Sequence, residues 1–303
     1  MSNQIAMEPK SFPEYLQAVS DSGGQVVPLS EAVRALIWLD YSQPGALAEL
    51  LDANPQIEWV QLPFAGVDAF SEIIKRPIRF TSAKGSYREP VAEHALALSL
   101  ALMRIIPERV KTNTWGRQFA ESLYESNILI LGGGGITEEL LKLLAPFRAR
   151  VTVVRKRPQT MSGAHKVVAL SELETELPNS DLVILAAALT PETHHIYDAR
   201  KFDLMKSSAY LVNIARGPII NTDDLVKALN NESIAGAAVD VTEPEPLPDG
   251  HPLWSAKNII ITPHSADTRK QVVRLFSDRI RENVRAYLAG SGWVGEVDPD
   301  LGY

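Results

Sequence analysis

A run of four glycines carries the first chemical signal in the sequence. Residues 132–135 are all Gly; they follow the β-like run Asn127–Leu131 and precede a helical pattern over residues 136–144. Glycines there let the backbone turn tightly and approach a pyrophosphate, while the helix N-terminus offers free N–H groups and a positive dipole end. The third glycine place of the GxGxxG pattern holds Thr137. The run favours a dinucleotide site, with a flexible turn or a methyltransferase-type glycine loop as alternatives.

The residues that follow the next predicted strand bear on the choice between NAD and NADP. An NAD-preferring site carries an acidic residue there, roughly 20 residues past the glycines, which bonds the ribose 2′-hydroxyl. In this chain the strand over residues 151–154 ends in Arg155, Lys156 and Arg157. A guanidinium group can hold a 2′-phosphate bidentately, whereas a carboxylate would repel it. The sequence therefore favours NADPH, with Arg155 best placed and a solvated basic loop as the alternative for the other two.

Three further segments place an arginine, a glutamate and a histidine after predicted strands. Residues 211–217 read LVNIARG, residues 239–248 read VDVTEPEPLP and residues 261–264 read ITPH. In order and spacing they resemble the D-isomer-specific 2-hydroxyacid dehydrogenases. The intervals that separate Arg216, Glu245 and His264 are similar to those of glyoxylate and hydroxypyruvate reductases. This resemblance is more specific than the glycine run.

The resemblance implies that a nicotinamide cofactor reduces a small 2-keto acid to the D-2-hydroxy acid. Such a reaction needs a hydride at the carbonyl carbon, a proton for the oxygen and a cation for the carboxylate. Arg216 would hold the carbonyl and the carboxylate, and His264 would supply the proton. Glu245 would stabilise the imidazolium and raise the pKa of His264. Each residue alone also fits a surface, salt-bridge or turn position, but together at the strand ends of one sheet they favour catalysis.

The resemblance covers almost the whole chain. Residues 64–68, FAGVD, are similar to the substrate-carboxylate loop of the family, which implies backbone N–H contacts from Ala65, Gly66 and Val67, and residues 91–96 are similar to its interdomain helix. Two departures, Thr137 for the third glycine and Ala188 where proline usually precedes Leu-Thr, concern the seating of the cofactor. The predicted cofactor contacts are Gly132, Gly134, Gly135, Ile136, Arg155, Lys156, Ala215 and Asp240.

The remaining histidines carry weaker signals. We expect His94 to pack on its helix, His251 to form a structural His-Pro-Leu turn, and His165, His194 and His195 to face solvent. The adjacent pair His194 and His195, without a carboxylate partner, makes a weak metal site, and we predict no metal centre. The sequence contains no GxxxxGK[ST], HExxH or GxSxG motif, which disfavours P-loop, zincin and α/β-hydrolase chemistry.

Alternating β-rich runs and helical patterns must position these residues. In the first part of the chain the candidate strands cover residues 25–27, 35–39, 58–62 and 78–81, and a second series of six begins at residue 128. Helical patterns between such strands predict parallel sheets covered by helices. We predict an α/β fold: a Rossmann-type doubly wound cofactor domain, residues 93–268, inserted in a flavodoxin-like substrate domain, residues 1–92 and 269–303. The active site is expected in the cleft that joins them.

Composition and charge are those of an ordinary folded protein. Of 303 residues, 45% are hydrophobic and 22% charged, which excludes disordered and collagen-like classes. The net charge of −7 disfavours nucleic-acid partners, and a Cys count of 0 excludes disulfides, thiolate metal sites and a cysteine nucleophile. Residues 1–10 lack a secretory profile and no apolar window is long enough for a bilayer, so we expect a soluble, cytoplasmic protein without a membrane partner.

The sequence thus predicts an NAD(P)H-dependent, NADPH-preferring reductase of a small substrate similar to glyoxylate or hydroxypyruvate. The family resemblance alone implies a homodimer. Two alternatives stay open. One is a phosphoglycerate dehydrogenase-type enzyme of serine synthesis, although the chain ends at Tyr303, before the extra regulatory domain that many of those enzymes carry. The other is a non-catalytic nucleotide-sensing interaction protein, because relatives of this fold serve as corepressors.

Overall fold

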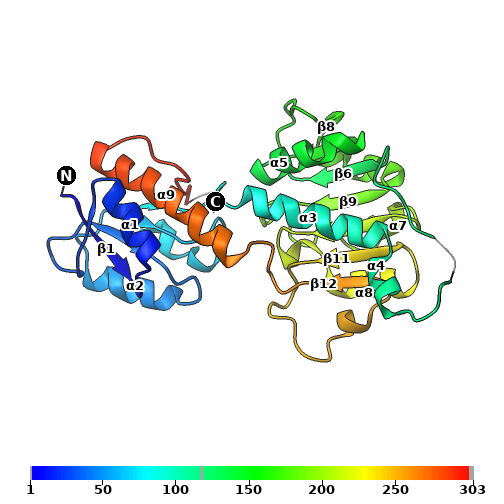
Figure 1. Cartoon of the computed structure of the whole chain (residues 1–303), viewed down its shortest axis with the longest axis horizontal. Helices are drawn as coiled ribbons and strands as arrows, with labels where there is room; N and C mark the ends of the chain where they lie inside the picture. Colours follow the sequence, from blue (N-terminus) through cyan, green and yellow to red (C-terminus); the bar gives the residue numbers. More distant parts are fainter. Residues whose placement is uncertain (1, 117–118, 300–303) are drawn as a thin grey trace. The chain divides into compact units, whose positions relative to one another are not determined.

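The chain divides into two compact units. The computed structural model describes residues 2–116 and 119–299. Unit 1 combines the N-terminal part up to Tyr87 with the C-terminal part from Thr268, and unit 2 is the continuous stretch Arg88–Asp267 (Figure 1). The predicted cofactor domain, residues 93–268, begins and ends slightly further along the chain than unit 2. Unit 2 is therefore an insertion between the two parts of unit 1.

Unit 1 is built on a five-stranded parallel sheet in the order β2-β1-β3-β4-β5. Its strands are β1 (Gln4–Glu8), β2 (Gln25–Val26), β3 (Ala35–Trp38), β4 (Trp59–Gln61) and β5 (Arg79–Thr81). Its helices are α1 (Pro13–Asp21), α2 (Pro44–Ala53) and α9 (Arg269–Ala289), with short 3₁₀ turns at Asp68–Phe70 and Ile73–Lys75. This strand order is the flavodoxin-like one, as predicted.

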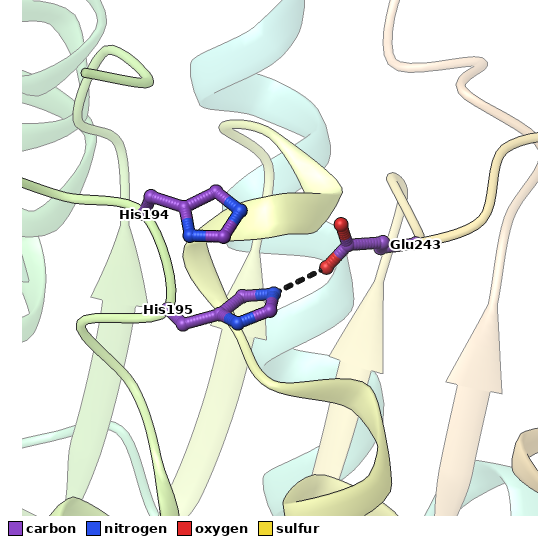
Figure 2. Close-up of side chains that lie close together, drawn as sticks. All are labelled: His194, His195 and Glu243. Atoms are coloured by element: carbon purple, nitrogen blue, oxygen red, sulfur yellow. Dashed lines mark hydrogen bonds and ion pairs between the residues drawn. The ribbon is translucent and has the colours of Figure 1, made fainter. Parts of the chain in front are cut away.

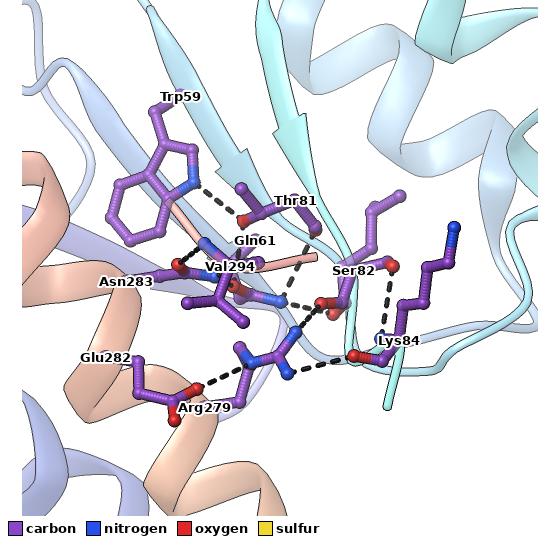
Figure 3. Close-up of polar contacts among 10 residues, drawn as sticks. Trp59, Gln61, Thr81, Ser82, Lys84, Arg279, Glu282, Asn283 and Val294 are labelled. Carbon is purple, nitrogen blue, oxygen red and sulfur yellow. Dashed lines mark hydrogen bonds and ion pairs between the residues drawn. The ribbon is translucent and has the colours of Figure 1, made fainter. Parts of the chain in front are cut away.

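Helix α9 joins the C-terminal part of the chain to the sheet of unit 1 through buried polar contacts (Figure 3). The Asn283 amide donates to Gln61 Oε1 at 2.7 Å, and the Thr81 hydroxyl donates to the same oxygen at 2.8 Å. Arg279 donates to the Ser82 carbonyl at 2.7 Å and to the Lys84 carbonyl at 2.9 Å. Gln61, Thr81 and Asn283 are fully buried. Every partner in this group belongs to unit 1, so its polar atoms are satisfied inside the fold.

Unit 2 contains a seven-stranded parallel sheet in the order β12-β11-β10-β9-β6-β7-β8. The strands are β6 (Asn127–Leu131), β7 (Arg150–Arg155), β8 (Lys166–Ala169), β9 (Leu182–Leu185), β10 (Tyr210–Asn213), β11 (Gly236–Val239) and β12 (Ile259–Ile261). Numbered from β6, this is the doubly wound order 3-2-1-4-5-6 with one more strand at the edge. Strands β6 to β8 follow one another toward one edge of the sheet and β9 to β12 toward the other, so the strand order reverses between β6 and β9. Ligands of such folds bind beyond the strand ends at that point.

Helices cover both faces of the unit 2 sheet. They are α3 (Arg88–Met103), α4 (Ile106–Lys111), α5 (Gly135–Leu144), α6 (Leu173–Glu176), α7 (Ala199–Leu204) and α8 (Thr222–Asn230). Alternate residues of β6 belong to different cores: Ile128 and Ile130 pack with α3 and α5, whereas Leu129 and Leu131 pack with α7 and α8. Helices α3 and α5 lie side by side over the first of these faces (Figure 1). Burial on both faces explains the nearly continuous apolar strands of this sheet.

The predicted α/β fold class is confirmed, with differences in single elements. Strands β1 and β8, and helix α7, were not predicted, because their segments QIAME, KVVA and ARKFDL are too short for a period to be recognised. Helix α3 begins at Arg88, three residues before the segment 91–96 that resembles the interdomain helix of the family. In the described part of the chain, none of the helices has the length and apolar character needed to span a membrane.

Candidate active site

The glycine turn lies where β6 meets α5, at the reversal point of the sheet. Gly132 has φ +111°, and a Cβ there would come within 2.5 Å of the Ala186 carbonyl oxygen that follows β9. Only glycine fits at this position. A Cβ on Gly134 would meet nothing within 4 Å, and Gly135 begins α5, whose first-turn N–H groups have no acceptor within the helix. The turn thus has the open backbone and helix N-terminus that a dinucleotide pyrophosphate requires.

Thr137 replaces the third glycine without disturbing this turn. It is fully buried, and its hydroxyl donates to the Gly132 carbonyl at 2.8 Å. The side chain therefore connects the first turn of α5 to the glycine that follows β6. The predicted contact Ile136 lies beside it in the first turn of the helix and is half-buried.

Arg88 is a cation near the glycine turn to which the sequence analysis assigned no role. Its Cδ lies 3.4 Å from the position that a Gly135 Cβ would take, and its Nε lies 3.3 Å from Glu139 Oε1. Lys142 Nζ approaches the same carboxylate oxygen at 2.8 Å. Glu139 is thus neutralised by two cations rather than left to repel a phosphate at the helix N-terminus. Because α3 begins about forty residues before the glycines, no local motif could indicate this contact.

Arg155 and Lys156, the two predicted cofactor-binding cations at the end of β7, differ in their contacts. Arg155 is the last residue of β7, and its side chain lies over the glycine turn, with Cδ 2.8 Å from the position of a Gly133 Cβ. Lys156 points to another partner, because its Nζ lies 2.8 Å from Glu192 Oε1 in an exposed ion pair. Arg155 is therefore the basic side chain of this pair that the fold places against the glycine turn.

Arg216 is held at the end of β10 by a buried asparagine. The Asn213 amide donates to the Arg216 carbonyl at 3.0 Å, and its oxygen accepts from the Ala215 N–H at 3.0 Å. The next residue, Gly217, lies so close to the Thr242 backbone that a Cβ would come within 1.9 Å of the carbonyl oxygen. The arginine therefore follows a turn whose backbone is fixed on both sides. Its own guanidinium donates to the Ala215 carbonyl at 2.7 Å.

Glu245 and His264 are directly paired. His264 Nδ1 lies 2.6 Å from Glu245 Oε1, and the two side chains are 52% and 40% exposed. The hydrogen bond to Glu245 raises the pKa of His264 against an opposing effect of burial, and the charge of Arg216 acts to lower it. The same hydrogen bond lowers the pKa of Glu245, with a smaller contribution from Arg216. The structure thus combines a carboxylate, an imidazole whose second nitrogen can face a ligand, and an arginine whose charge reaches both.

Asp240 fixes the loop that carries His264. It is 2% exposed and accepts from the Thr262 hydroxyl at 2.5 Å, from the Ser265 N–H at 2.9 Å and from the Ala266 N–H at 3.2 Å. Burial alone would raise the pKa of Asp240, but hydrogen bonds from His94, Thr262 and the Ser265 N–H hold its pKa below the ordinary value. Its carboxylate thus acts as an anchor for residues 262–266. The predicted contact of Asp240 with a cofactor stays a prediction.

The other predicted residues have distinct surroundings. Ala65, Gly66 and Val67 lie in unit 1, in the loop between β4 and the 3₁₀ turn Asp68–Phe70, and their role stays a prediction. Ala215 is buried at the end of β10. His94 lies 3.1 Å from the Thr262 hydroxyl, and His251 accepts from the Leu253 N–H in the expected turn. The interpretation that His194 and His195 lack a carboxylate partner is wrong, because His195 Nε2 lies 2.5 Å from Glu243 Oε2.

The fold and the glycine turn define a dinucleotide-binding α/β protein. Residues 95–266 match the family model of the D-isomer specific 2-hydroxyacid dehydrogenase, NAD binding domain. The chain belongs to this family, as the sequence motifs predicted, and it is an NAD(P)-dependent oxidoreductase.

Individual relatives agree with this assignment. A glyoxylate reductase of Thermofilum pendens is 32% identical over 80% of this chain and 75% of its own length. A glyoxylate reductase/hydroxypyruvate reductase of Mus musculus is 32% identical over 82% of this chain and 80% of its own. The crystal structure of a D-isomer specific 2-hydroxyacid dehydrogenase from Xanthobacter autotrophicus Py2, in complex with NADPH and MES, is 25% identical, covers 100% of both chains and has a TM-score of 0.86.

Proposed function

We propose that the chain reduces a small 2-keto acid, such as glyoxylate or hydroxypyruvate, to the D-2-hydroxy acid with NADPH. The observation that carries this proposal is the 2.6 Å pair of His264 and Glu245 within reach of the Arg216 charge. The printed names of the Thermofilum pendens and Mus musculus relatives support the substrate class. A keto acid has an anionic carboxylate and a carbonyl that accepts a proton on reduction, which matches a cation and a proton donor.

Each residue then has a defined task. The cofactor supplies a hydride when it is bound at the glycine turn. Arg216 binds the carboxylate and the carbonyl oxygen, which polarises the carbonyl and fixes the face that it presents. His264 holds a proton at its second ring nitrogen and releases it to the forming hydroxyl, while Glu245 stabilises the imidazolium beforehand. We also propose the backbone N–H groups of Ala65, Gly66 and Val67 as contacts of the substrate carboxylate.

The preference for NADPH is the finer part of the proposal. It is supported by Arg155, whose side chain lies over the glycine turn, and by NADPH in the crystal structure of the Xanthobacter relative. A charged hydrogen bond to a phosphate contributes on the order of 1.5–3 kcal/mol, which is a factor of about 10 to 150 in kcat/KM. Arg155→Asp should therefore lower the ratio of kcat/KM values for NADPH and NADH by about that factor.

A neighbouring arginine supplies the control for this test. Arg157 is exposed and lies beyond the end of β7, so Arg157→Asp changes the same charge away from the glycine turn. It should change the cofactor ratio much less than Arg155→Asp does. Equal efficiency with both cofactors in the unmodified protein would contradict the preference.

A panel of 2-keto acids with NADPH and NADH, followed by the loss of reduced-cofactor absorbance, tests the activity itself. Turnover of glyoxylate or hydroxypyruvate with a D-2-hydroxy acid as product supports the proposal. Selective turnover of phosphohydroxypyruvate would favour the phosphoglycerate dehydrogenase alternative instead. No turnover with any keto acid would favour the non-catalytic alternative.

We further propose that the chain forms a homodimer through unit 2, while a cytoplasmic location stays a prediction. Helix α4 and the segment after it expose large apolar side chains: Ile106 is 48%, Val110 76%, Trp115 91% and Phe119 71% exposed. Large apolar side chains that are exposed to this degree are typical of protein–protein interfaces. Sedimentation analysis should show a dimer that Val110→Asp with Trp115→Glu converts to monomers, while Trp254→Glu, at another exposed indole of unit 2, leaves it intact. A monomeric unmodified protein would contradict this assembly.

A further inference from the structure

We propose that His194, His195 and Glu243 form a binding site for a divalent transition-metal ion. Each side chain offers one ligand atom, and these atoms lie within 4.8 Å of one another (Figure 2). In residues 2–116 and 119–299, this is the single group of three or more His, Asp or Glu side chains with that spacing. The site lies outside the group formed by Arg216, Glu245 and His264 and is not used in the proposed reaction.

The fold brings these side chains together from two loops of unit 2. His194 and His195 follow β9, and Glu243 follows β11. Adjacent side chains of a regular strand point to opposite sides, so two neighbouring histidines would not ordinarily converge. Here His195 has φ +48°, in the left-handed region, and the rings stack with centroids 4.0 Å apart. The backbone conformation therefore places both imidazoles on the side where Glu243 lies.

Hydrogen bonds hold the backbone of both loops in place before any ion binds. The His195 N–H donates to the Pro218 carbonyl at 2.7 Å, and the His194 N–H donates to the Thr190 carbonyl at 2.9 Å. On the other loop, the Thr222 hydroxyl donates to the Glu243 carbonyl at 2.8 Å. Only side-chain rotations are then needed to adjust the ligand atoms. Such preorganisation lowers the entropic cost of binding.

The distances suit an ion after a small adjustment. His195 Nε2 and Glu243 Oε2 are 2.5 Å apart, and the widest pair of ligand atoms lies within 4.8 Å. Two donors at about 2.1 Å from a tetrahedral zinc ion are separated by about 3.4 Å, a value between these limits. An ion would thus take the place of the proton between His195 and Glu243, while His194 moves inward.

The donor set and its exposure indicate the kind of ion. Imidazole and carboxylate donors suit zinc, copper, nickel or cobalt, whereas magnesium and calcium prefer oxygen donors alone. The side chains of His195 and Glu243 are each 36% exposed, so an ion can reach them from solvent. Three protein ligands leave a coordination position for water.

Zinc titration by calorimetry tests the proposal with the full-length, untagged protein after chelator treatment. We expect one Zn²⁺ site per chain and no comparable binding of Mg²⁺. His194→Ala removes a ligand whose ring has no hydrogen bond to another described residue, so folding should be retained. It should weaken Zn²⁺ binding at least about tenfold, since the loss of even an outer contact of a metal ligand costs 10- to 100-fold. Glu243→Gln, which keeps the side-chain shape, should weaken it similarly.

His165→Ala is the matched control, because it removes an exposed histidine of the same unit outside the cluster. It should leave Zn²⁺ binding unchanged. As a second measurement, Co²⁺ should give the visible absorption of a four- or five-coordinate nitrogen and oxygen site, which His194→Ala abolishes. The chain contains no Cys, so thiolate ligands cannot produce that signal. Absence of Zn²⁺ binding, or equal binding in the His194 and His165 variants, would show that His195 and Glu243 form only an ion pair.

Discussion

Both sheets carry buried polar side chains at the ends of their strands, but these side chains act differently. In unit 1, Gln61 ends β4 and Thr81 ends β5, and their partners are each other, Trp59 and the α9 residue Asn283 (Figure 3). In unit 2, Asn213 ends β10 and Asp240 follows β11. Their partners include backbone groups of the loops that carry Arg216 and His264. A polar strand end is therefore closed off in one unit and supports exposed chemical groups in the other.

The difference shows what distinguishes a site from a structural network. Gln61, Thr81, Asn213 and Asp240 are all almost fully buried, so burial does not separate the two cases. The two cases differ in the side chain that the buried residue helps to position. In unit 2 the positioned side chains are the cation Arg216 and the titratable His264, which is 52% exposed. Substitutions of Arg216 and His264 in unit 2 should therefore affect turnover, and substitutions in the buried polar network of unit 1 should affect stability.

The largest effect is expected for His264→Ala. Loss of a general acid lowers kcat by roughly 10²–10⁴, while the midpoint of thermal unfolding should change little because the side chain is half exposed. Steady-state kinetics and calorimetry measure the two quantities. His165→Ala should change neither. If His264→Ala retained kcat or lost much stability, the strand ends of unit 2 would not differ in function from those of unit 1.

Arg216→Lys should have the next largest effect on turnover. A lysine keeps the charge but cannot reproduce the planar fork that holds a carboxylate and a carbonyl together, and misplacement of a substrate can cost about 10² in rate. We expect kcat/KM to fall by about that factor while NADPH binding, measured by fluorescence, persists. Arg200→Lys, at an exposed arginine paired with Glu174, is the control. Near-normal kcat/KM in the Arg216 variant would count against its assigned role.

In unit 1, Asn283→Ala should lower stability. The Asn283 amide bonds both the N–H and the carbonyl of Val294, at 2.9 Å each, in part-buried contacts, and it donates to the fully buried Gln61 oxygen at 2.7 Å, so its removal takes a partner from each of these groups. Each such group costs about 1–3 kcal/mol, and we expect the free energy of unfolding to fall by about 2–4 kcal/mol in denaturant titrations. Asn3→Ala removes an exposed amide of the same unit and should cost far less. Equal costs would mean that the network contributes nothing beyond the exposed contact.

The smallest expected effect is a shift of the pH profile in Glu245→Gln. The carboxylate raises the pKa of His264, so its replacement by an amide lowers that pKa. Reduction needs protonated His264, and activity falls as pH rises through its pKa. The basic limb of the kcat/KM profile should therefore move to lower pH, provided that chemistry limits the rate. Glu174→Gln should leave the limb in place; a limb that is unmoved or shifted upward in Glu245→Gln excludes Glu245 as the partner.

Sequence reasoning succeeded where the signal is local. The glycine turn, the alternation of strands and helices and the order of the family motifs all lie in short stretches, and the fold class followed from them. The pairing of Glu245 and His264 was expected from the family resemblance together with their positions after predicted strands. The role of Thr137 as a donor to Gly132 could not be read from the pattern, because it depends on how α5 packs against β6.

Contacts between distant segments were missed for a physical reason. Arg88 lies near Gly135 because α3 packs against α5. Glu243 reaches His195 because the sheet brings together the loops that follow β9 and β11. Nor does any pattern distinguish Gln61 from Asn213, since both are polar residues that end apolar strands. What covers a strand end is decided by the tertiary fold, in this case by the C-terminal helix α9 for unit 1.

The placement of α9 also has a consequence for the order of events during synthesis. The first 87 residues leave the ribosome early, yet Gln61 and the Ser82 and Lys84 carbonyls have partners on α9, which is translated after unit 2. Unit 2 is continuous in sequence and is complete before α9 exists. Since domains generally fold as units, unit 2 should fold first on the ribosome. The N-terminal segment should complete its fold only after α9 has been synthesised. Protease protection of stalled nascent chains should appear for unit 2 before it appears for the N-terminal segment.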